Sequence, residues 1–359
     1  MLSRSESDVQ PIRAGEELDW SRVVSWMRER LGAIDIPGVD VSRDPEIAQF
    51  PGGHSNLTYR LRFGDADLVL RRPPLGPVAP TAHDMVREYR WLAAIHPHFA
   101  LAPRVYLLCE DLDVIGVPFY VMERRTGIVV RTEEPPALQN PAARRRLSES
   151  LIDTLASLHA IDVERAGLSG MGKPAGFVER QVKGWSERWV RSQTTTLPEM
   201  DALAAWLRGH LPPPPSPPAV VHGDFKLDNV MLDGRDVTKL IGVFDWEMCT
   251  LGDPLVDLGI VLAYWSPTAP PSQRDALTTV IDRPGYFTRD EIIERYSSRS
   301  ARDLSRIRFY EVFAVFKIAV VIQQIYYRFE NGQTTDQRFA SFDQRVAFLA
   351  RHAARLASV

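Results

Sequence analysis

The stretch Val220–Gly259 reads VVHGDFKLDNVMLDGRDVTKLIGVFDWEMCTLGDPLVDLG. Two short apolar runs within it, 230–232 and 240–244, flank Asp233-Gly234, a dipeptide that is typical of tight turns. This pattern predicts a β-hairpin. We interpret the rest of the chain outward from this hairpin, because polar residues stand just before its first strand and just after its second.

Three of these polar residues carry oxygen atoms suited to metal and proton chemistry. Asp224 and Asn229 precede the first strand, and Asp245 follows the second. Mg²⁺ takes oxygen ligands, usually one or two from the protein and the rest from water and phosphate. Asn229 and Asp245 are therefore predicted metal ligands, and Asp224 is left to accept a proton. An Asp beside a Gly is usually a turn residue, so only the ordered set indicates a site.

The order of these residues is that of protein kinases, with two departures. A catalytic Asp, an Asn five residues later and a metal-binding Asp are all present, but H-R-D becomes His222-Gly223-Asp224 and D-F-G becomes Asp245-Trp246-Glu247. The stretch resembles the aminoglycoside phosphotransferase and choline-kinase-like family, and it is also similar to kinase domains fused to acyl-CoA dehydrogenases. The resemblance covers roughly residues 45–330. It implies an α+β, bilobal protein-kinase-like fold, with a small antiparallel-sheet N-lobe and a larger, mostly helical C-lobe.

The resemblance also implies a reaction. ATP, with GTP as the alternative donor, would transfer its γ-phosphate to a hydroxyl group of a small molecule. Asp224 would act as the base, and Asn229 and Asp245 would hold Mg²⁺. Lys226 is a predicted catalytic residue that contacts the transferred phosphate, and a solvated loop residue is the equal alternative. Asp257 is expected to brace the catalytic loop through hydrogen bonds to its backbone, although an acid near a helix start is common in any case.

Five further residues are predicted to bind the nucleotide, all by position in the family pattern. Ser55 and Asn56 lie in a glycine-containing turn that would cover the phosphates. Arg71, at the end of a strand, takes the place of the phosphate-binding Lys, and Glu88 on the next helix is its expected partner. Glu123 lies where the backbone between the lobes would contact adenine.

Composition indicates an ordinary globular enzyme. Hydrophobic residues make up 45% of the chain and charged residues 25%, with a formal net charge of −3. No polyanion-binding signature is present, so a nucleic-acid partner is not expected. The two cysteines, Cys109 and Cys249, have no near partner in sequence and fit a reduced, cytoplasmic setting. A monomer or a homodimer is expected.

No membrane association is expected either. The first twenty residues contain no apolar run of the kind found in signal peptides. The most apolar helix candidate, Val312–Tyr327, is short for a membrane span and carries Lys317. A buried helix is therefore the better interpretation.

Three regions are predicted. Residues 1–44 form an N-terminal extension with one helix, residues 45–123 form the N-lobe, and residues 124–359 form the C-lobe with the catalytic loop and the metal-binding Asp. A helical segment at 167–211 is expected to contribute to the acceptor site. Its tryptophans, Trp185, Trp189 and Trp206, are equally well explained as core anchors.

Two helices of the C-lobe carry more specific expectations. Pro141–Ile161 shows an apolar stripe, with Arg144-Arg145-Arg146 expected on its solvated face and His159 expected to pack behind the catalytic loop. A second helix is expected to start at Pro254 with Asp253 as its N-cap.

The same residues disfavour three alternative functions. A nucleotide-binding regulatory protein without turnover is disfavoured because Asp224, Asn229 and Asp245 are all present. A protein kinase is disfavoured by the missing H-R-D arginine and A-P-E segment, and a metallohydrolase by the scattered histidines. The acceptor stays open: a polycationic aminoglycoside would need acids such as Glu247 and Asp253, whereas a hydroxyacyl acceptor suits the apolar segment around Trp185.

Overall fold

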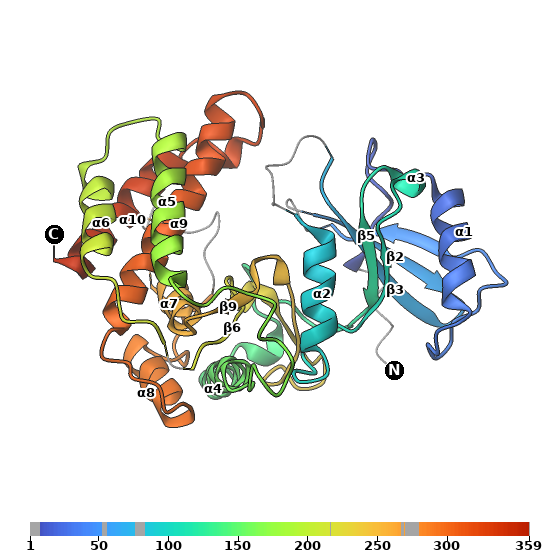
Figure 1. Cartoon of the computed structure of the whole chain (residues 1–359), viewed down its shortest axis with the longest axis horizontal. Helices are drawn as coiled ribbons and strands as arrows, with labels where there is room; N and C mark the ends of the chain where they lie inside the picture. Colours follow the sequence, from blue (N-terminus) through green and yellow to red (C-terminus); the bar gives the residue numbers. More distant parts are fainter. Residues whose placement is uncertain are drawn as a thin grey trace. The chain divides into compact units, whose positions relative to one another are not determined.

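The computed structural model describes residues 8–51, 56–75, 83–215, 217–266, 269 and 280–358. The chain divides into two compact units, Met1–Thr126 and Gly127–Val359, called unit 1 and unit 2 below. A small antiparallel sheet and many helices confirm the predicted α+β fold class (Figure 1).

Unit 1 is built on a five-stranded antiparallel sheet in the order β1-β2-β3-β5-β4, with α1 on one face and α2 on the other (Figure 1). Its strands are β1 (Glu46–Gln49), β2 (Leu57–Phe63), β3 (Ala66–Arg72), β4 (Val105–Cys109) and β5 (Phe119–Glu123). Its helices are α1 (Trp20–Leu31), α2 (Met85–Ile95) and the short α3 (Leu112–Ile115). The acidic connection between β4 and β5 contains α3, which Asp111 begins by accepting a hydrogen bond from the Asp113 N–H.

The pleat of β3 separates an apolar face from a charged one. Leu68 and Leu70 point into a core that α1 covers with Val23 and Met27. Because successive side chains of a strand alternate between faces, Arg71 lies on the opposite face. There its guanidinium meets Glu88 of α2.

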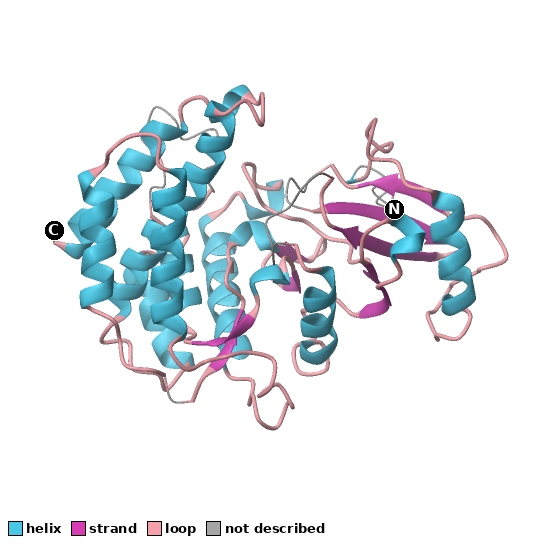
Figure 2. Cartoon of the chain, turned by 45° about the horizontal axis from the view of Figure 1, so that its top comes forward, coloured by secondary structure: helices cyan, strands magenta, loops and turns pink. Residues whose placement is uncertain are grey.

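Unit 2 is mostly helical, as Figure 2 shows, with two small two-stranded sheets. Its helices are α4 (Pro141–His159), α5 (Phe177–Ser192), α6 (Pro198–Gly209), α7 (Leu255–Tyr264), α8 (Arg289–Arg299), α9 (Ile307–Glu330) and α10 (Phe342–Ala357). Its strands are β6 (Ala219–Val221), β7 (Val230–Leu232), β8 (Leu240–Val243) and β9 (Thr250–Gly252). The antiparallel β7–β8 pair is the hairpin that the sequence predicts, and β6 pairs with β9.

Helix α9 is the core helix of unit 2. In the described part of the chain it is the one helix long and apolar enough to cross a membrane, and 78% of its apolar stretch is buried within the protein. Helices α5, α7 and α10 pack against it. Its buried polar side chains have partners: Gln323 donates to the Ser192 carbonyl at 2.8 Å, and Lys317 donates to the Gly223 carbonyl.

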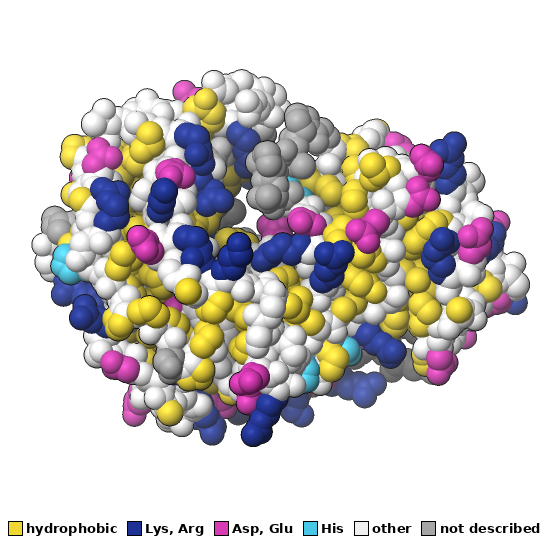
Figure 3. Space-filling view, in the orientation of Figure 1, with side chains coloured by type: hydrophobic (Ala, Val, Ile, Leu, Met, Phe, Trp, Pro, Cys, Tyr) yellow, Lys and Arg dark blue, Asp and Glu magenta, His cyan; other side chains and the backbone are white. Residues whose placement is uncertain are grey.

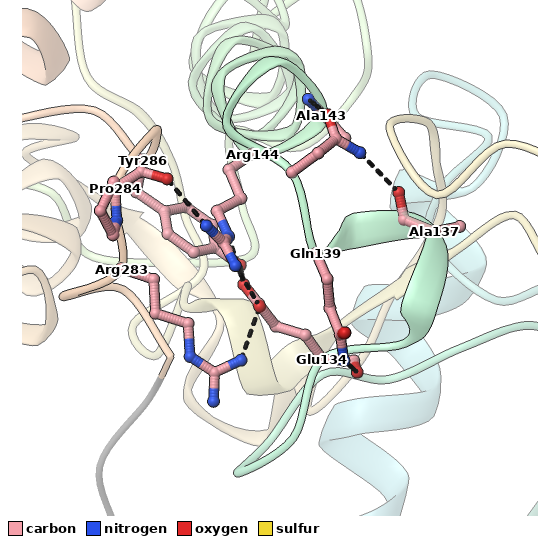
Figure 4. A network of polar contacts seen from close by, with 9 residues as sticks. Glu134, Ala137, Gln139, Ala143, Arg144, Arg283, Pro284 and Tyr286 are labelled. Atoms are coloured by element: carbon pink, nitrogen blue, oxygen red, sulfur yellow. Dashed lines mark hydrogen bonds and ion pairs between the residues drawn. The ribbon is translucent and has the colours of Figure 1, made fainter.

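The arginine cluster on α4 is only partly solvated: Arg145 and Arg146 are exposed as expected, but Arg144 is not. Arg144 forms a bidentate pair with the fully buried Glu134, with nitrogen–oxygen distances of 2.9 and 2.8 Å. The same carboxylate accepts hydrogen bonds from Arg283 and from the Tyr286 hydroxyl (Figure 4). Burial raises the pKa of Glu134, but these donors outweigh burial and the net pKa lies below the usual value. Sequence alone does not show that Glu134, ten residues before Arg144, turns inward to meet it.

Helix α7 begins one residue later than predicted and lies very close to α9. It starts at Leu255, whose N–H donates to the Asp253 carboxylate at 3.0 Å. Gly259 stands where α7 meets α9: a Cβ there would lie 2.5 Å from the Tyr310 carbonyl oxygen. Two backbones approach this closely only where one residue lacks a side chain.

Gly259→Ala is therefore expected to destabilise unit 2, because α7 and α9 would have to separate. Overpacking of this kind costs about 1–3 kcal/mol in the free energy of unfolding. Thermal unfolding of the purified protein measures the change. Gly209→Ala, at the end of α6, is the matched control, because a Cβ there meets nothing within 4 Å. Its Tm should stay the same or rise, and an equal loss in both variants would show that the helix contact is not what requires glycine.

Candidate active site

The catalytic loop is fixed from behind by one buried carboxylate. Asp257, in the first turn of α7, accepts hydrogen bonds from the backbone N–H groups of His222 and Gly223 at 2.6 and 2.7 Å. His159, at the end of α4, lies with Nε2 3.2 Å from the same carboxylate, and its Nδ1 contacts the Tyr296 hydroxyl at 2.8 Å. The bracing expected of Asp257 and the position expected of His159 are thus both present in the structure.

Asp224 follows directly on this braced backbone. Gly223 has a φ of +85°, and a Cβ at this position would lie 2.8 Å from Met248, so the turn needs glycine. The Asp224 carboxylate then accepts hydrogen bonds from Lys226 Nζ at 2.9 Å and from Asn229 Nδ2 at 3.0 Å. Asn229 Nδ2 also donates to the Asp224 carbonyl at 2.9 Å.

The hairpin brings Asp245 to the same loop. The Phe244 N–H donates to the Asn229 carbonyl at 2.8 Å, and the Phe244 carbonyl lies 2.9 Å from Nε2 of His222. Asp245 itself has a φ of +67°, a region that non-glycine residues rarely occupy and that marks functional positions. Asp224, Asn229 and Asp245 are therefore brought together on one short stretch of backbone.

Charge and burial together set the ionisation of the loop. Burial raises the pKa of Asp224, but the positive charges of Lys226 and Lys317 outweigh burial, so the carboxylate titrates below its usual range. Burial also lowers the pKa of His222, which keeps that ring neutral. Burial raises the pKa of Asp228, whose Oδ1 is buried without a hydrogen-bond partner. An ionised Asp224 is the form that accepts a proton.

The donor set fits a hard cation that brings most of its own ligands. The Asn229 amide nitrogen donates to Asp224, so the amide oxygen of Asn229 points away from Asp224. Asp245 supplies a carboxylate. In the described ranges, no group of three or more His, Cys, Asp or Glu side chains is arranged to hold a metal ion. A metal held by one amide and one carboxylate oxygen must complete its shell with water or phosphate, as Mg²⁺ does.

Unit 1 holds the residues predicted to bind nucleotide. Arg71 Nε lies 3.1 Å from the carboxylate of Glu88, and the Glu88 side chain is only 2% exposed. Asn56 is buried directly before β2, and Ser55 lies outside the described residues. Glu123 ends β5, where its carboxylate accepts from the Arg104 N–H and from Arg125 and its own N–H donates to the Arg104 carbonyl. Its backbone donor is therefore already engaged within unit 1.

Two residues near Asp224 were not predicted as site residues. Lys317 of α9 donates to the Gly223 carbonyl at 2.5 Å, and the Tyr264 ring lies 4.9 Å from Lys226 Nζ. In the sequence, Lys317 is a lone lysine within an apolar run. That feature argues against a membrane span but does not indicate a contact with the catalytic loop. Nothing in the sequence near Tyr264 points to the catalytic loop.

Trp185 and Asp253, both considered for the acceptor site, are buried in the structure. Trp185 and Trp189 are both buried on α5, and the Trp185 ring carries Lys317 Nζ at 5.4 Å and the Arg188 guanidinium at 4.6 Å from its centroid. Asp253 is 3% exposed and accepts a hydrogen bond from the Tyr310 hydroxyl. It is therefore not available to line a pocket for a polycationic acceptor.

Comparison with known proteins gives a family and two long relatives. Residues 46–291 match the model of the phosphotransferase enzyme family. Acyl-CoA dehydrogenase family member 10 of Mus musculus is 34% identical over 310 residues, which cover 85% of this chain and 29% of the relative. Acyl-CoA dehydrogenase family member 11 of Homo sapiens is 30% identical over 351 residues, which cover 96% of this chain and 44% of the relative. The chain thus spans less than half the length of these two relatives.

Solved structures share the fold. A protein from Ralstonia eutropha assigned as an aminoglycoside phosphotransferase is 28% identical, with a TM-score of 0.79 over 95% of this chain and 99% of that one. The GDP and kanamycin complex of APH(2")-IIia is 15% identical, with a TM-score of 0.61 over 92% of this chain and 98% of that one. At that identity the likeness shows the fold alone.

The buried histidine behind the loop predicts a pH dependence of stability. Burial lowers the pKa of His159 in the folded protein, so below the unfolded value of about 6.5 the unfolded chain binds more protons than the folded one and stability falls. One such histidine accounts for a loss of about 1.4 kcal/mol between about pH 7.5 and about pH 5.5. Chemical denaturation at the two pH values measures this difference.

His159→Gln removes that titration and should reduce the stability difference between the two pH values, even though the variant is less stable at both. His98→Gln is the control, because His98 is exposed. A pH dependence that His159→Gln leaves at its wild-type size would contradict the assignment.

Proposed function

Because the chain belongs to the phosphotransferase enzyme family, whose model matches residues 46–291, we propose that it is a small-molecule kinase. It transfers the γ-phosphate of ATP, with GTP as the alternative donor, to a hydroxyl group of a small acceptor. The observation that carries this proposal is the Asp224 carboxylate, held by Lys226 and Asn229 on a loop that Asp257 braces. A carboxylate fixed by hydrogen bonds and kept ionised by neighbouring cations is a proton acceptor of defined position.

Asp224 orients the acceptor hydroxyl and receives its proton. The acceptor oxygen forms a bond to the γ-phosphorus while the bond from that phosphorus to the β,γ-bridging oxygen breaks, so ADP leaves and the hydroxyl proton passes to the carboxylate. A loose transition state requires little basicity, so position contributes more than a raised pKa. Lys226, 2.9 Å from Asp224, supplies the positive charge nearest to the transferred group.

Asn229 and Asp245 are the residues that would hold Mg²⁺. When bound, the ion neutralises charge on the β- and γ-phosphates. The backbone hydrogen bond between Phe244 and Asn229 holds the two backbone segments that carry these side chains together.

In unit 1, we propose that Arg71 contacts the non-transferred phosphates and that Glu88 fixes the direction of its guanidinium. Arg71 Nε lies 3.1 Å from the Glu88 carboxylate, and a planar guanidinium is well suited to phosphate recognition. The phosphate-covering role of Ser55 and Asn56 and the adenine-binding role of Glu123 stay predictions.

The charges around Asp224 favour a hydroxyacyl acceptor over an aminoglycoside. Lys226 and Lys317 both act on Asp224, and Arg188 lies over Trp185 on the same side of unit 2. Basic side chains also gather over α5 (Figure 3). A polycation would be repelled by these groups, whereas a carboxylate, thioester or phosphate-bearing acceptor would not.

The names of the relatives agree with this preference. Both are acyl-CoA dehydrogenase family members, and the chain aligns with less than half of each. We propose that the acceptor is a hydroxyacyl compound, with the aminoglycoside-like acceptor as the alternative to be tested.

Asp224→Asn should slow phosphoryl transfer strongly while nucleotide binding persists. Loss of a positioned base costs about 10²–10⁴ in rate, and the amide keeps the shape of the carboxylate. Release of ADP in the presence of hydroxylated acceptors measures turnover, and calorimetry measures the Kd of ATP. Asp201→Asn, an exposed position on α6, is the matched control and should behave as wild type. Turnover that Asp224→Asn leaves intact would contradict the proposed base, and ATP binding without turnover in the wild type would favour the regulatory alternative.

The acceptor is tested separately, with the wild-type protein. A hydroxyacyl-CoA thioester should give kcat/KM at least about tenfold higher than kanamycin, because about 1.4 kcal/mol of electrostatic preference corresponds to a factor of ten. Mass spectrometry of the product identifies the phosphorylated hydroxyl. Faster phosphorylation of kanamycin would overturn the acceptor class and leave the role of Asp224 standing.

A further inference from the structure

A buried ammonium group lies beneath the catalytic loop. Lys317 is 7% exposed, in the middle of the core helix α9. Its Nζ donates to the Gly223 carbonyl at 2.5 Å, lies 3.8 Å from the Met248 sulfur and stands 5.4 Å from the centroid of the Trp185 ring. Over the described part of the chain, no carboxylate forms an ion pair with it. Its three N–H groups are thus turned toward a carbonyl, a thioether and an aromatic face.

This arrangement is unfavourable for the fold alone. An ammonium group taken out of water without a carboxylate in contact loses hydration that one carbonyl replaces only in part. Burial accordingly lowers the pKa of Lys317. A methionine of similar length would fill the same space without that cost.

The Lys317 contact lies at the peptide bond between Gly223 and Asp224. The carbonyl of this peptide accepts from Lys317, and its N–H, on Asp224, points to His222 Nδ1 at 3.2 Å. The preceding peptide is held through the Gly223 N–H by Asp257. The backbone on both sides of Gly223 is therefore held by an anion on one side and a cation on the other, which fixes the direction of the Asp224 side chain.

We propose that Lys317 is a positioning residue for phosphoryl transfer: its ammonium group fixes the Gly223–Asp224 peptide and places a positive charge behind the Asp224 carboxylate. This inference rests on the proposed function. Lys317 acts through Asp224 and does not touch the substrate. It explains why a buried charge without a contacting carboxylate is present in the centre of an apolar helix.

The test is Lys317→Met, with three measurements on the full chain. The kcat of phosphoryl transfer should fall about tenfold or more, because a fixed charge beside a reacting group is lost. The KM for the acceptor and the directly measured Kd of ATP should stay within about twofold of wild type. The Tm should change by no more than a few degrees, since loss of the buried charge offsets the unpaired Gly223 carbonyl.

Gln323→Met is the matched control, a second buried polar residue of α9 that bonds to Ser192 and Thr194 instead of the catalytic loop. It should lower the Tm and leave kcat per folded molecule unchanged. The double variant Lys317→Met with Asp224→Asn adds a second criterion: it should be no slower than Asp224→Asn alone, because both changes remove the same interaction.

The outcomes separate this inference from the proposed function. If Asp224→Asn slows turnover strongly but Lys317→Met retains the wild-type kcat, or loses activity only together with a large fall in Tm, the positioning role is overturned and the kinase assignment stands. If the wild type transfers no phosphate from ATP to any acceptor, the proposed function is overturned and the role of Lys317 with it.

Discussion

The grip of the Asp257 carboxylate on two consecutive backbone N–H groups is the interaction on which the rest of the site depends. It holds His222 and Gly223 in a turn that an unsupported chain would not keep, with Gly223 at a positive φ. Because Asp257 lies in the first turn of α7, its hydrogen bonds attach the loop to a helix that packs on the core helix α9. The positions of Asp224, Asn229 and, through Phe244, Asp245 all follow from this one anchored turn.

The electrostatics of unit 2 reinforce the same arrangement. Asp224 is buried, and burial alone would favour its protonated form, yet two lysines keep it ionised. His222 and His159 are buried as neutral rings, so each serves as a shaped hydrogen-bonding group without adding charge. The loop thus places an ionised Asp224 carboxylate beside two lysines and two neutral histidine rings.

The parts of the site that sequence predicted are those that the chain holds close together in order. The H-G-D sequence, Asn229 and Asp245 lie within one hairpin and its flanks, and the family match confirms the resemblance that they indicated. The Arg71–Glu88 pair was also expected, because strand and helix follow each other directly. The short-range pattern therefore carries the family and the fold class, and the predicted site residues lie in one segment of the chain.

What sequence could not supply are contacts set by packing between distant segments. Lys317 is 94 residues from Gly223, and only the packing of α9 under the loop reveals its partner. Arg144 was expected to be solvated because its neighbours are charged, but Glu134 turns inward and removes it from water. Asp253 was expected as a helix cap and does accept from the Leu255 N–H, but its other oxygen accepts from the Tyr310 hydroxyl of α9. In each case the deciding partner is a side chain whose direction the linear pattern does not specify.

The reach of these contacts has a consequence for how the site is assembled. The loop residue His222 is tied to Asp257 across 35 residues, Asp257 to His159 across 98, and Gly223 to Lys317 across 94. Bringing such distant residues together costs chain entropy before the contacts form, so these contacts form slowly. During synthesis on the ribosome the hairpin emerges long before α9, and the Lys317 contact to Gly223 cannot form until that helix has left the exit tunnel. Competence for chemistry is therefore a late event in the life of each new chain.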